Sequence, residues 1–302
     1  VAIKEDGIVD FGRIVTAMVT PFDSDLAVNW SEVKRLIDYL IEEQQTDSIV
    51  VCGTTGESPT LSHEEKLELF RVSVEHANGR CRIIAGTGSN DTEETVQLTK
   101  EAEHIGVDGI LLVAPYYNRP SQEGLYRHFR KAAEATKLPV MLYNIPSRTG
   151  INVSVDTTLR LTRDVPNIVA SKEAHSDFDH FSSLIAQSPD HFKVYSGDDV
   201  ITLPLLAIGA YGVVSVASHV IGKEMKAMVT AYLNGDVRKA AEWHAKLSPI
   251  FHGLFNCPHR VPNPVPVKAA LELHGIRAGG VRLPLVEATE QEREFIRTLF
   301  QR

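Results

Sequence analysis

Short runs of β-branched and aliphatic residues alternate with longer amphipathic segments from near the N-terminus to beyond the middle of the chain. This alternation predicts parallel strands joined by crossover helices. We expect eight strands, at residues 14–20, 48–52, 82–85, 109–114, 140–144, 168–172, 193–196 and 212–216. Eight such units favour a closed (β/α)8 TIM barrel, because a doubly wound sheet usually has fewer strands and a G-x-G-x-x-G fingerprint, which this sequence lacks.

Apolar residues recur at helical spacing between the strands, at residues 31–44, 62–77, 91–105 and 121–136. Ser62 precedes Glu65 by three residues, and Asp91 precedes Glu94 in the same way, so both pairs predict capped helix starts. Helical patterns continue after the eighth strand, at 223–234, 237–255, 266–273 and 290–300. We therefore expect a barrel over residues 1–220 and a C-terminal helical extension over residues 221–302, more often a packing element than a chemical one.

Composition argues against several classes of partner. The formal net charge is -8 and no run of lysine and arginine is present, so we expect no nucleic-acid partner. Residues 1–10 are charged and lack the apolar stretch of a signal peptide, and no apolar run is long enough for a membrane span. The three cysteines, Cys52, Cys81 and Cys257, suit neither a disulfide framework nor a C-x-x-C metal site. We expect a cytoplasmic protein without membrane contact.

Polar residues gather directly after the predicted strands, where the active sites of such barrels lie. Lys172 ends the apolar run 168–170. Burial there would lower the pKa of its ammonium group and make the neutral amine a nucleophile toward a ketone. A structural salt bridge with Glu173 or Asp198 is an equal alternative from placement alone. Lys193 is the weaker candidate, because it stands at the start of its strand.

Side chains at the neighbouring strand ends could transfer protons to such an amine or bind its substrate. Tyr143 can shuttle protons to it, although a tyrosine at a barrel rim is commonly a packing residue. Thr54 and Thr55, flanked by glycines, can bind a small carboxylate or simply satisfy a turn. Arg148 can hold a substrate carboxylate in a bidentate fork, although a surface arginine is the commoner case.

The twelve histidines show no H-x-x-x-H spacing and no third ligand on one element, so we assign no metal. Ser58 does not lie in a G-x-S-x-G elbow, and a serine hydrolase has no support.

Taken together, these segments resemble the dihydrodipicolinate synthase family, within the pyruvate-dependent class I aldolases. The resemblance covers nearly the whole chain and rests on residues 53–57 (GTTGE), 115–118 (PYYN), 143–150 (YNIPSRTG), 172–174 (KEA), 196–199 (SGDD) and 212–216 (GVVSV). It implies condensation of pyruvate with L-aspartate-4-semialdehyde to 4-hydroxy-tetrahydrodipicolinate, the first step toward diaminopimelate and lysine. It also implies that no cofactor is needed, because the protonated Schiff base is the electron sink.

The resemblance assigns roles residue by residue. Lys172 matches the Schiff-base lysine and Tyr143 the general acid and base. Thr55, Tyr143 and Tyr117 match a proton relay, in which Tyr117 reaches into a neighbouring subunit and so implies a homo-oligomer, expected to be a tetramer of two tight dimers. The substrate-binding residues implied are Thr54, Thr55, Arg148, Gly197 and Val214.

Some residues depart from the family pattern. Ser171 replaces an aliphatic residue, His175 stands where serine is common, and residues 256–261 form a slightly longer segment. Lys66 and Pro59 replace a histidine and a smaller residue of the lysine-inhibited members, although His63, Asn90, Glu94 and Tyr116 match that effector site. We expect weak or absent inhibition by lysine.

Two other functions remain open. One is a sibling aldolase that cleaves a sugar acid such as N-acetylneuraminate or a 2-keto-3-deoxy acid. The other is a non-catalytic barrel that binds a small carboxylate, with Lys172 as a salt-bridge partner.

Overall fold

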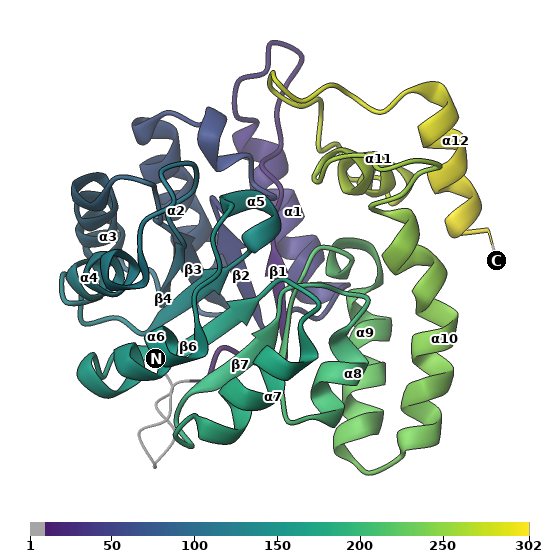
Figure 1. The fold of residues 1–302 in the computed structure, drawn as a ribbon. Coiled ribbons are helices and arrows are strands. Elements are labelled where there is room, and N and C mark those ends of the chain that lie inside the picture. The colour runs from purple at the N-terminus through teal and green to yellow at the C-terminus, as the bar shows by residue number, and fades with distance from the viewer. Residues whose placement is uncertain (1–9, 302) are drawn as a thin grey trace.

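The computed structural model describes residues 10–301, so most of the N-terminal segment in which we expect no signal peptide lies outside it. Eight parallel strands close into a barrel in which each strand pairs with the next and β8 pairs with β1 (Figure 1). The strands are β1 Ile14–Ala17, β2 Ser48–Val51, β3 Arg82–Gly86, β4 Gly109–Val113, β5 Val140–Asn144, β6 Ile168–Glu173, β7 Lys193–Ser196 and β8 Gly212–Ser215. The predicted TIM barrel is confirmed.

Helices follow the strands and surround the barrel. They are α1 Trp30–Glu42, α2 His63–Ala77, α3 Thr92–Ile105, α4 Gln122–Ala133, α6 Val155–Asp164, α7 Phe178–Gln187, α8 Thr202–Ala207 and α9 Ser218–Leu233. A 3-10 turn, η1 Ser58–Thr60, follows β2, and the one-turn α5 Pro146–Thr149 follows β5. Ser62 and Glu65 form the predicted capping box at the start of α2. Asp91 caps α3, whereas Glu94 turns instead to the Ser89 hydroxyl.

The first strand is three residues shorter than predicted. Met18 N–H still donates to Val50 O at 3.0 Å, but Val19 N–H donates to Nε2 of the buried His219 at 3.1 Å. The backbone therefore leaves the ladder because a side chain from α9 takes over its hydrogen bond.

Two apolar layers form the core. The outer layer fills the space between strands and helices. The inner layer fills the barrel with side chains from all around it: Phe11, Val15, Ala17, Val50, Ile84, Leu111, Met141, Tyr143, Ile145, Ala170, Tyr195 and Val214. The barrel is thus a packed core, and the active sites of such barrels lie at the C-terminal ends of their strands.

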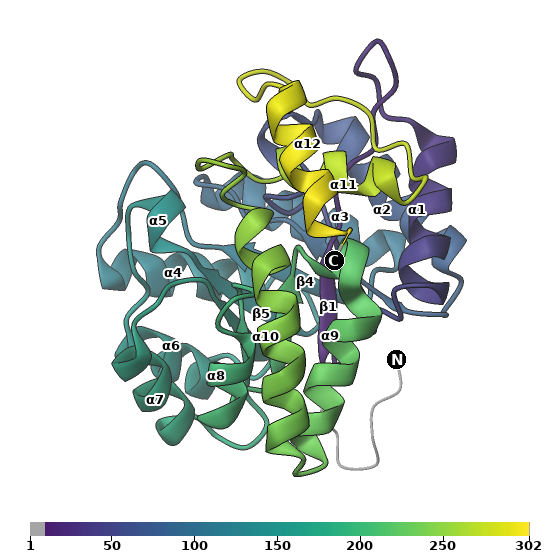
Figure 2. The same cartoon turned by 90° about the vertical axis from the view of Figure 1, so that its right-hand side faces the viewer.

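Three further helices follow α9: α10 Val237–Gly253, α11 Val265–Leu273 and α12 Glu290–Leu299. Helix α10 packs along α9, and α12 packs against α11 (Figure 2). The division of the chain at residue 220 stays a prediction. None of the helices within residues 10–301 is long and apolar enough to cross a membrane.

Candidate active site

Lys172 and Tyr143 lie side by side at the C-terminal ends of β6 and β5, where they are paired in register. Lys172 is 5% exposed and Tyr143 also 5%, and the Lys172 Nζ lies 4.1 Å from the centroid of the Tyr143 ring. Glu173, the next residue on β6, contacts His175 and His180. Because successive side chains of a strand point to opposite faces, Glu173 is directed away from Lys172 and is not its salt-bridge partner.

Burial changes the acidity of both groups. Desolvation lowers the pKa of Lys172 to about 7; the negative charge of Asp199 opposes this shift, and the positive charge of Arg148 adds to it. Desolvation raises the pKa of Tyr143 to about 12, against the opposing effects of Arg148 and of a hydrogen bond with Thr54. At neutral pH a sizeable share of Lys172 is therefore the free amine, while Tyr143 holds its proton.

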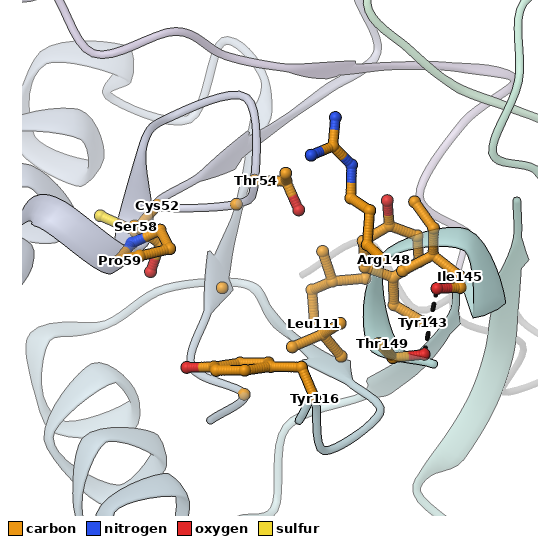
Figure 3. Close-up of a pocket in the computed structure, with 14 residues that line it drawn as sticks. Cys52, Thr54, Ser58, Pro59, Leu111, Tyr116, Tyr143, Ile145, Arg148 and Thr149 are labelled. Atoms are coloured by element: carbon orange, nitrogen blue, oxygen red, sulfur yellow. Dashed lines mark hydrogen bonds between the residues drawn. The ribbon is translucent and has the colours of Figure 1, made fainter. Parts of the chain in front are cut away.

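A cavity of about 230 Å³ opens above these strand ends (Figure 3). Its wall includes Tyr143, Thr54, Arg148 and Tyr116, together with Leu111 and several glycines. Figure 3 shows the guanidinium of Arg148 turned toward Thr54, with the Tyr116 ring on another side of the space. Lys172 itself is not part of the wall, but its amine is next to the ring of Tyr143, which is. The cavity offers hydroxyls and one cation to a small anionic substrate.

The threonine pair lies in a tight turn after β2. Gly56 N–H and Ser58 N–H both donate to Gly53 O, at 3.1 and 3.3 Å. Thr55 is buried, and its Oγ1 accepts a hydrogen bond at 2.9 Å from Nδ2 of Asn263. Asn263 precedes α11, so the C-terminal extension holds a hydroxyl of the candidate site. No local pattern predicts this contact, because the two residues are 208 positions apart.

A buried ion pair stabilises the same turn. The Lys268 Nζ of α11 lies 2.7 Å from Glu57 Oε1, and their side chains are 3% and 1% exposed. Glu57 Oε2 accepts a hydrogen bond from Arg282 N–H at 2.9 Å. Glu57 has a left-handed backbone, with φ of 57°, which costs a residue with a Cβ on the order of 1 kcal/mol. These contacts stabilise that conformation of the turn.

With this geometry established, comparison with known proteins identifies the family. The sequence model of the dihydrodipicolinate synthetase family matches residues 10–302. The chain belongs to the dihydrodipicolinate synthetase family. It is 56% identical to 4-hydroxy-tetrahydrodipicolinate synthase of Desulforamulus reducens, over 96% of this chain and 97% of the relative.

Solved structures agree with this membership of the dihydrodipicolinate synthetase family. Dihydrodipicolinate synthase DapA-2 of Bacillus anthracis superposes with a TM-score of 0.93 at 50% identity, covering 97% of this chain and 98% of the other. The Cyanidioschyzon merolae enzyme, solved with lysine bound, gives a TM-score of 0.92 at 45% identity, over 96% and 97% of the two chains.

The remaining predicted site residues divide into buried and exposed ones. Val214 on β8 is buried in the inner layer of the barrel. Gly197 follows β7, and its N–H donates to Glu173 O at 2.7 Å. A Cβ at this position would lie 2.7 Å from the Ala174 Cβ, so the close approach of the two backbone segments requires glycine. Arg148 on α5 is exposed.

Tyr117 is 90% exposed, with φ of 75°, and does not line the cavity, whereas its neighbour Tyr116 does. Within one chain it does not join Lys172 and Tyr143.

The departures from the family pattern lie close to the site. The Ser171 hydroxyl is buried without a hydrogen-bond partner among the described residues. His175 contacts Glu173. Residues 256–260 close a small turn, in which Cys257 N–H donates to His259 O at 2.7 Å, and the chain then leads directly to Asn263. The longer segment therefore precedes a residue that contacts Thr55.

Proposed function

We propose that this chain condenses pyruvate with L-aspartate-4-semialdehyde to give 4-hydroxy-tetrahydrodipicolinate, the first step of the lysine and diaminopimelate branch. The observation that carries the proposal is Lys172: a desolvated amine beside Tyr143, which lines a cavity with hydroxyls and a guanidinium. The chain's membership of a family of such synthases supports the choice among pyruvate aldolases, and it does not favour the sugar-acid lyase or the binding barrel.

The first step is addition of the neutral Lys172 amine to the ketone carbon of pyruvate. The Tyr143 phenol, which keeps its proton at neutral pH, donates it to the departing oxygen, and water leaves as the Schiff base forms. The protonated imine then withdraws electrons from the pyruvate methyl group. The Tyr143 phenolate, which has given up its proton, takes one methyl proton, and the resulting enamine is the carbon nucleophile.

Two sets of contacts hold the reactants in this proposal. Thr54 and Thr55 donate to the pyruvate carboxylate, with Val214 and Gly197 closing the space around the methyl end. Arg148 forms a bidentate pair with the carboxylate of the semialdehyde, an arrangement that only a guanidinium supplies. The enamine attacks the aldehyde carbon, and Tyr143 protonates the aldehyde oxygen, which becomes the hydroxyl of the product. The amino group of the second substrate then displaces Lys172 from the imine carbon, which closes the ring and frees the enzyme.

The exposure of Tyr117 supports the inference of an oligomer. A tyrosine that is 90% exposed on a left-handed backbone is suited to contact another subunit, where it would complete a relay with Thr55 and Tyr143. We infer a homo-oligomer, with the tetramer of two tight dimers as its expected form. Cys52, Cys81 and Cys257 are free and buried, which supports a reducing, cytoplasmic location.

The test is mass spectrometry of the intact protein after incubation with pyruvate and borohydride. The expected result is one reduced adduct in the native protein, none in Lys172→Ala, and full labelling in Lys193→Ala, the matched lysine at the start of β7. A coupled assay then measures turnover with aspartate semialdehyde. Absence of an adduct in the native protein would refute the mechanism, and an adduct without turnover of the semialdehyde would refute the substrate.

A further inference from the structure

Three potential metal ligands meet on the outer side of β6, opposite the face that carries Lys172. The Glu173 Oε2 lies 3.0 Å from Nε2 of His175 and 3.7 Å from Nε2 of His180. All three ligand atoms lie within 4.8 Å of one another. They come from a strand end, a loop and a helix, which explains why no spacing in the sequence reveals them.

The surrounding structure holds these groups in place. The His175 ring stacks on Phe181 of α7, with 4.4 Å between centroids and 1° between planes. His180 lies in the first turn of α7, and its N–H donates to Oδ1 of the capping Asp177 at 3.0 Å. Asn144 Nδ2 donates to Glu173 Oε2 at 2.8 Å and thereby orients the carboxylate. Such orienting contacts are what metal ligands require.

His180 supplies the independent sign of a ligand. Its side chain is 6% exposed, and its Nε2 has no hydrogen-bond partner in the described structure. Glu173 Oε2, at 3.7 Å, is too far for a hydrogen bond. A buried polar atom without a partner loses its hydration without compensation, and a cation between the two atoms would remove that cost.

We propose that Glu173, His175 and His180 bind one divalent transition-metal ion of the Zn²⁺ class. With bonds of about 2.0–2.1 Å, neighbouring ligand atoms of a tetrahedral zinc site lie about 3.3 Å apart, and the observed 3.0 and 3.7 Å bracket that spacing. Two imidazoles and one carboxylate suit Zn²⁺, whereas Mg²⁺ and Ca²⁺ prefer all-oxygen sites. Water supplies the fourth ligand beside His175, the most exposed of the three.

Binding has an identifiable cost. His175 Nδ1 accepts a hydrogen bond from Asp177 N–H at 3.2 Å. A metal on Nε2 would shift the ring proton to Nδ1 and break this contact. Metal binding would also replace the hydrogen bond between His175 Nε2 and Glu173 Oε2, which lie 3.0 Å apart, so three metal–ligand bonds have to outweigh both losses. The ion would join the end of β6 to α7, and it takes no part in the chemistry at Lys172.

The experiment titrates the metal-stripped full-length protein with Co²⁺ and Zn²⁺. Co²⁺ should give the intense visible absorption of a four-coordinate site at one ion per chain, and Zn²⁺ should displace it and raise the unfolding midpoint. His175→Ser and His180→Gln should each weaken binding at least tenfold. His128→Gln, which alters a buried histidine elsewhere, should bind as the native protein does.

Three results would overturn the proposal: no stoichiometric binding, six-coordinate Co²⁺ spectra, or unchanged affinity in His175→Ser. His175→Ser carries the test if His180→Gln fails to fold, because His175 lies nearer the surface. The pyruvate adduct at Lys172 forms without the metal, so failure here is distinguishable from failure of the proposed function.

Discussion

Replacing Lys268 by methionine should destabilise the protein strongly, because it leaves Glu57 as a buried carboxylate without its cation. Lys268 Nζ contacts Glu57 Oε1 at 2.7 Å, donates to Gly280 O at 2.7 Å and lies 4.2 Å from the Phe22 ring centroid. Both partners are almost fully buried. Breaking such a pair from one side costs about 3–5 kcal/mol, since the remaining charge is desolvated without compensation.

The measurement is equilibrium urea unfolding at one fixed protein concentration, because subunit association contributes to the stability of an oligomer. The double variant Lys268→Met with Glu57→Gln should recover a large part of the loss, because it leaves neither charge unpaired and the glutamine can still accept from Arg282 N–H. Lys226→Met is the matched control. Its pair with Asp47, which is 2.8 Å long, is partly exposed and should contribute less than about 1 kcal/mol.

Activity provides a second readout of Lys268→Met. Glu57 fixes the turn that carries Thr54 and Thr55, so KM for pyruvate should rise in molecules that remain folded. A loss below about 1 kcal/mol in Lys268→Met, or a double variant as unstable as the sum of both single variants, would refute the reasoning.

Three other predictions concern separate features. Burial lowers the pKa of His219 to about 4, so the unfolded chain binds more protons than the folded one between about pH 6.5 and 4. The free energy of unfolding should therefore fall by about 3 kcal/mol as the pH drops through that range, and urea unfolding of His219→Gln should show a smaller pH dependence. Arg148→Ala should raise KM for aspartate semialdehyde about 10- to 100-fold while the borohydride-trapped pyruvate adduct still forms; an unchanged KM would remove Arg148 from substrate binding. Lysine should inhibit weakly or not at all, because Lys66 and Pro59 depart from the effector-site pattern; activity that falls steeply at submillimolar lysine would contradict this.

Local patterns were sufficient to predict the strands and the position of Lys172. Each strand is a short apolar run that ends in a polar residue. Because all strands of the barrel are parallel, these polar residues lie together at its C-terminal end. The shortened β1 could not be predicted, since its end depends on His219, which lies 200 residues away. Helices α6, α7 and α8 were not identified individually; they have at most ten residues each, and their periodicity is short.

The contacts that shape the site depend on parts of the chain that no local pattern connects. Asn263 meets Thr55, and Lys268 meets Glu57, only because the chain after β8 returns to the open end of the barrel. The cluster around Glu173 was missed for a similar reason. A search for histidines on one helix cannot find a carboxylate on the preceding strand.

The C-terminal extension therefore does more than cover the barrel. Asn263 donates to the Thr55 hydroxyl, Lys268 pairs with Glu57, and the backbone of Arg282 donates to the same carboxylate. All three contacts reach one turn, the segment after β2 that carries Thr54 and Thr55. A hydroxyl that already accepts from Asn263 has its own proton free for another acceptor, which is what a relay or a carboxylate site needs. The barrel thus supplies the amine, while the extension determines the geometry of the hydroxyls proposed to hold pyruvate against it.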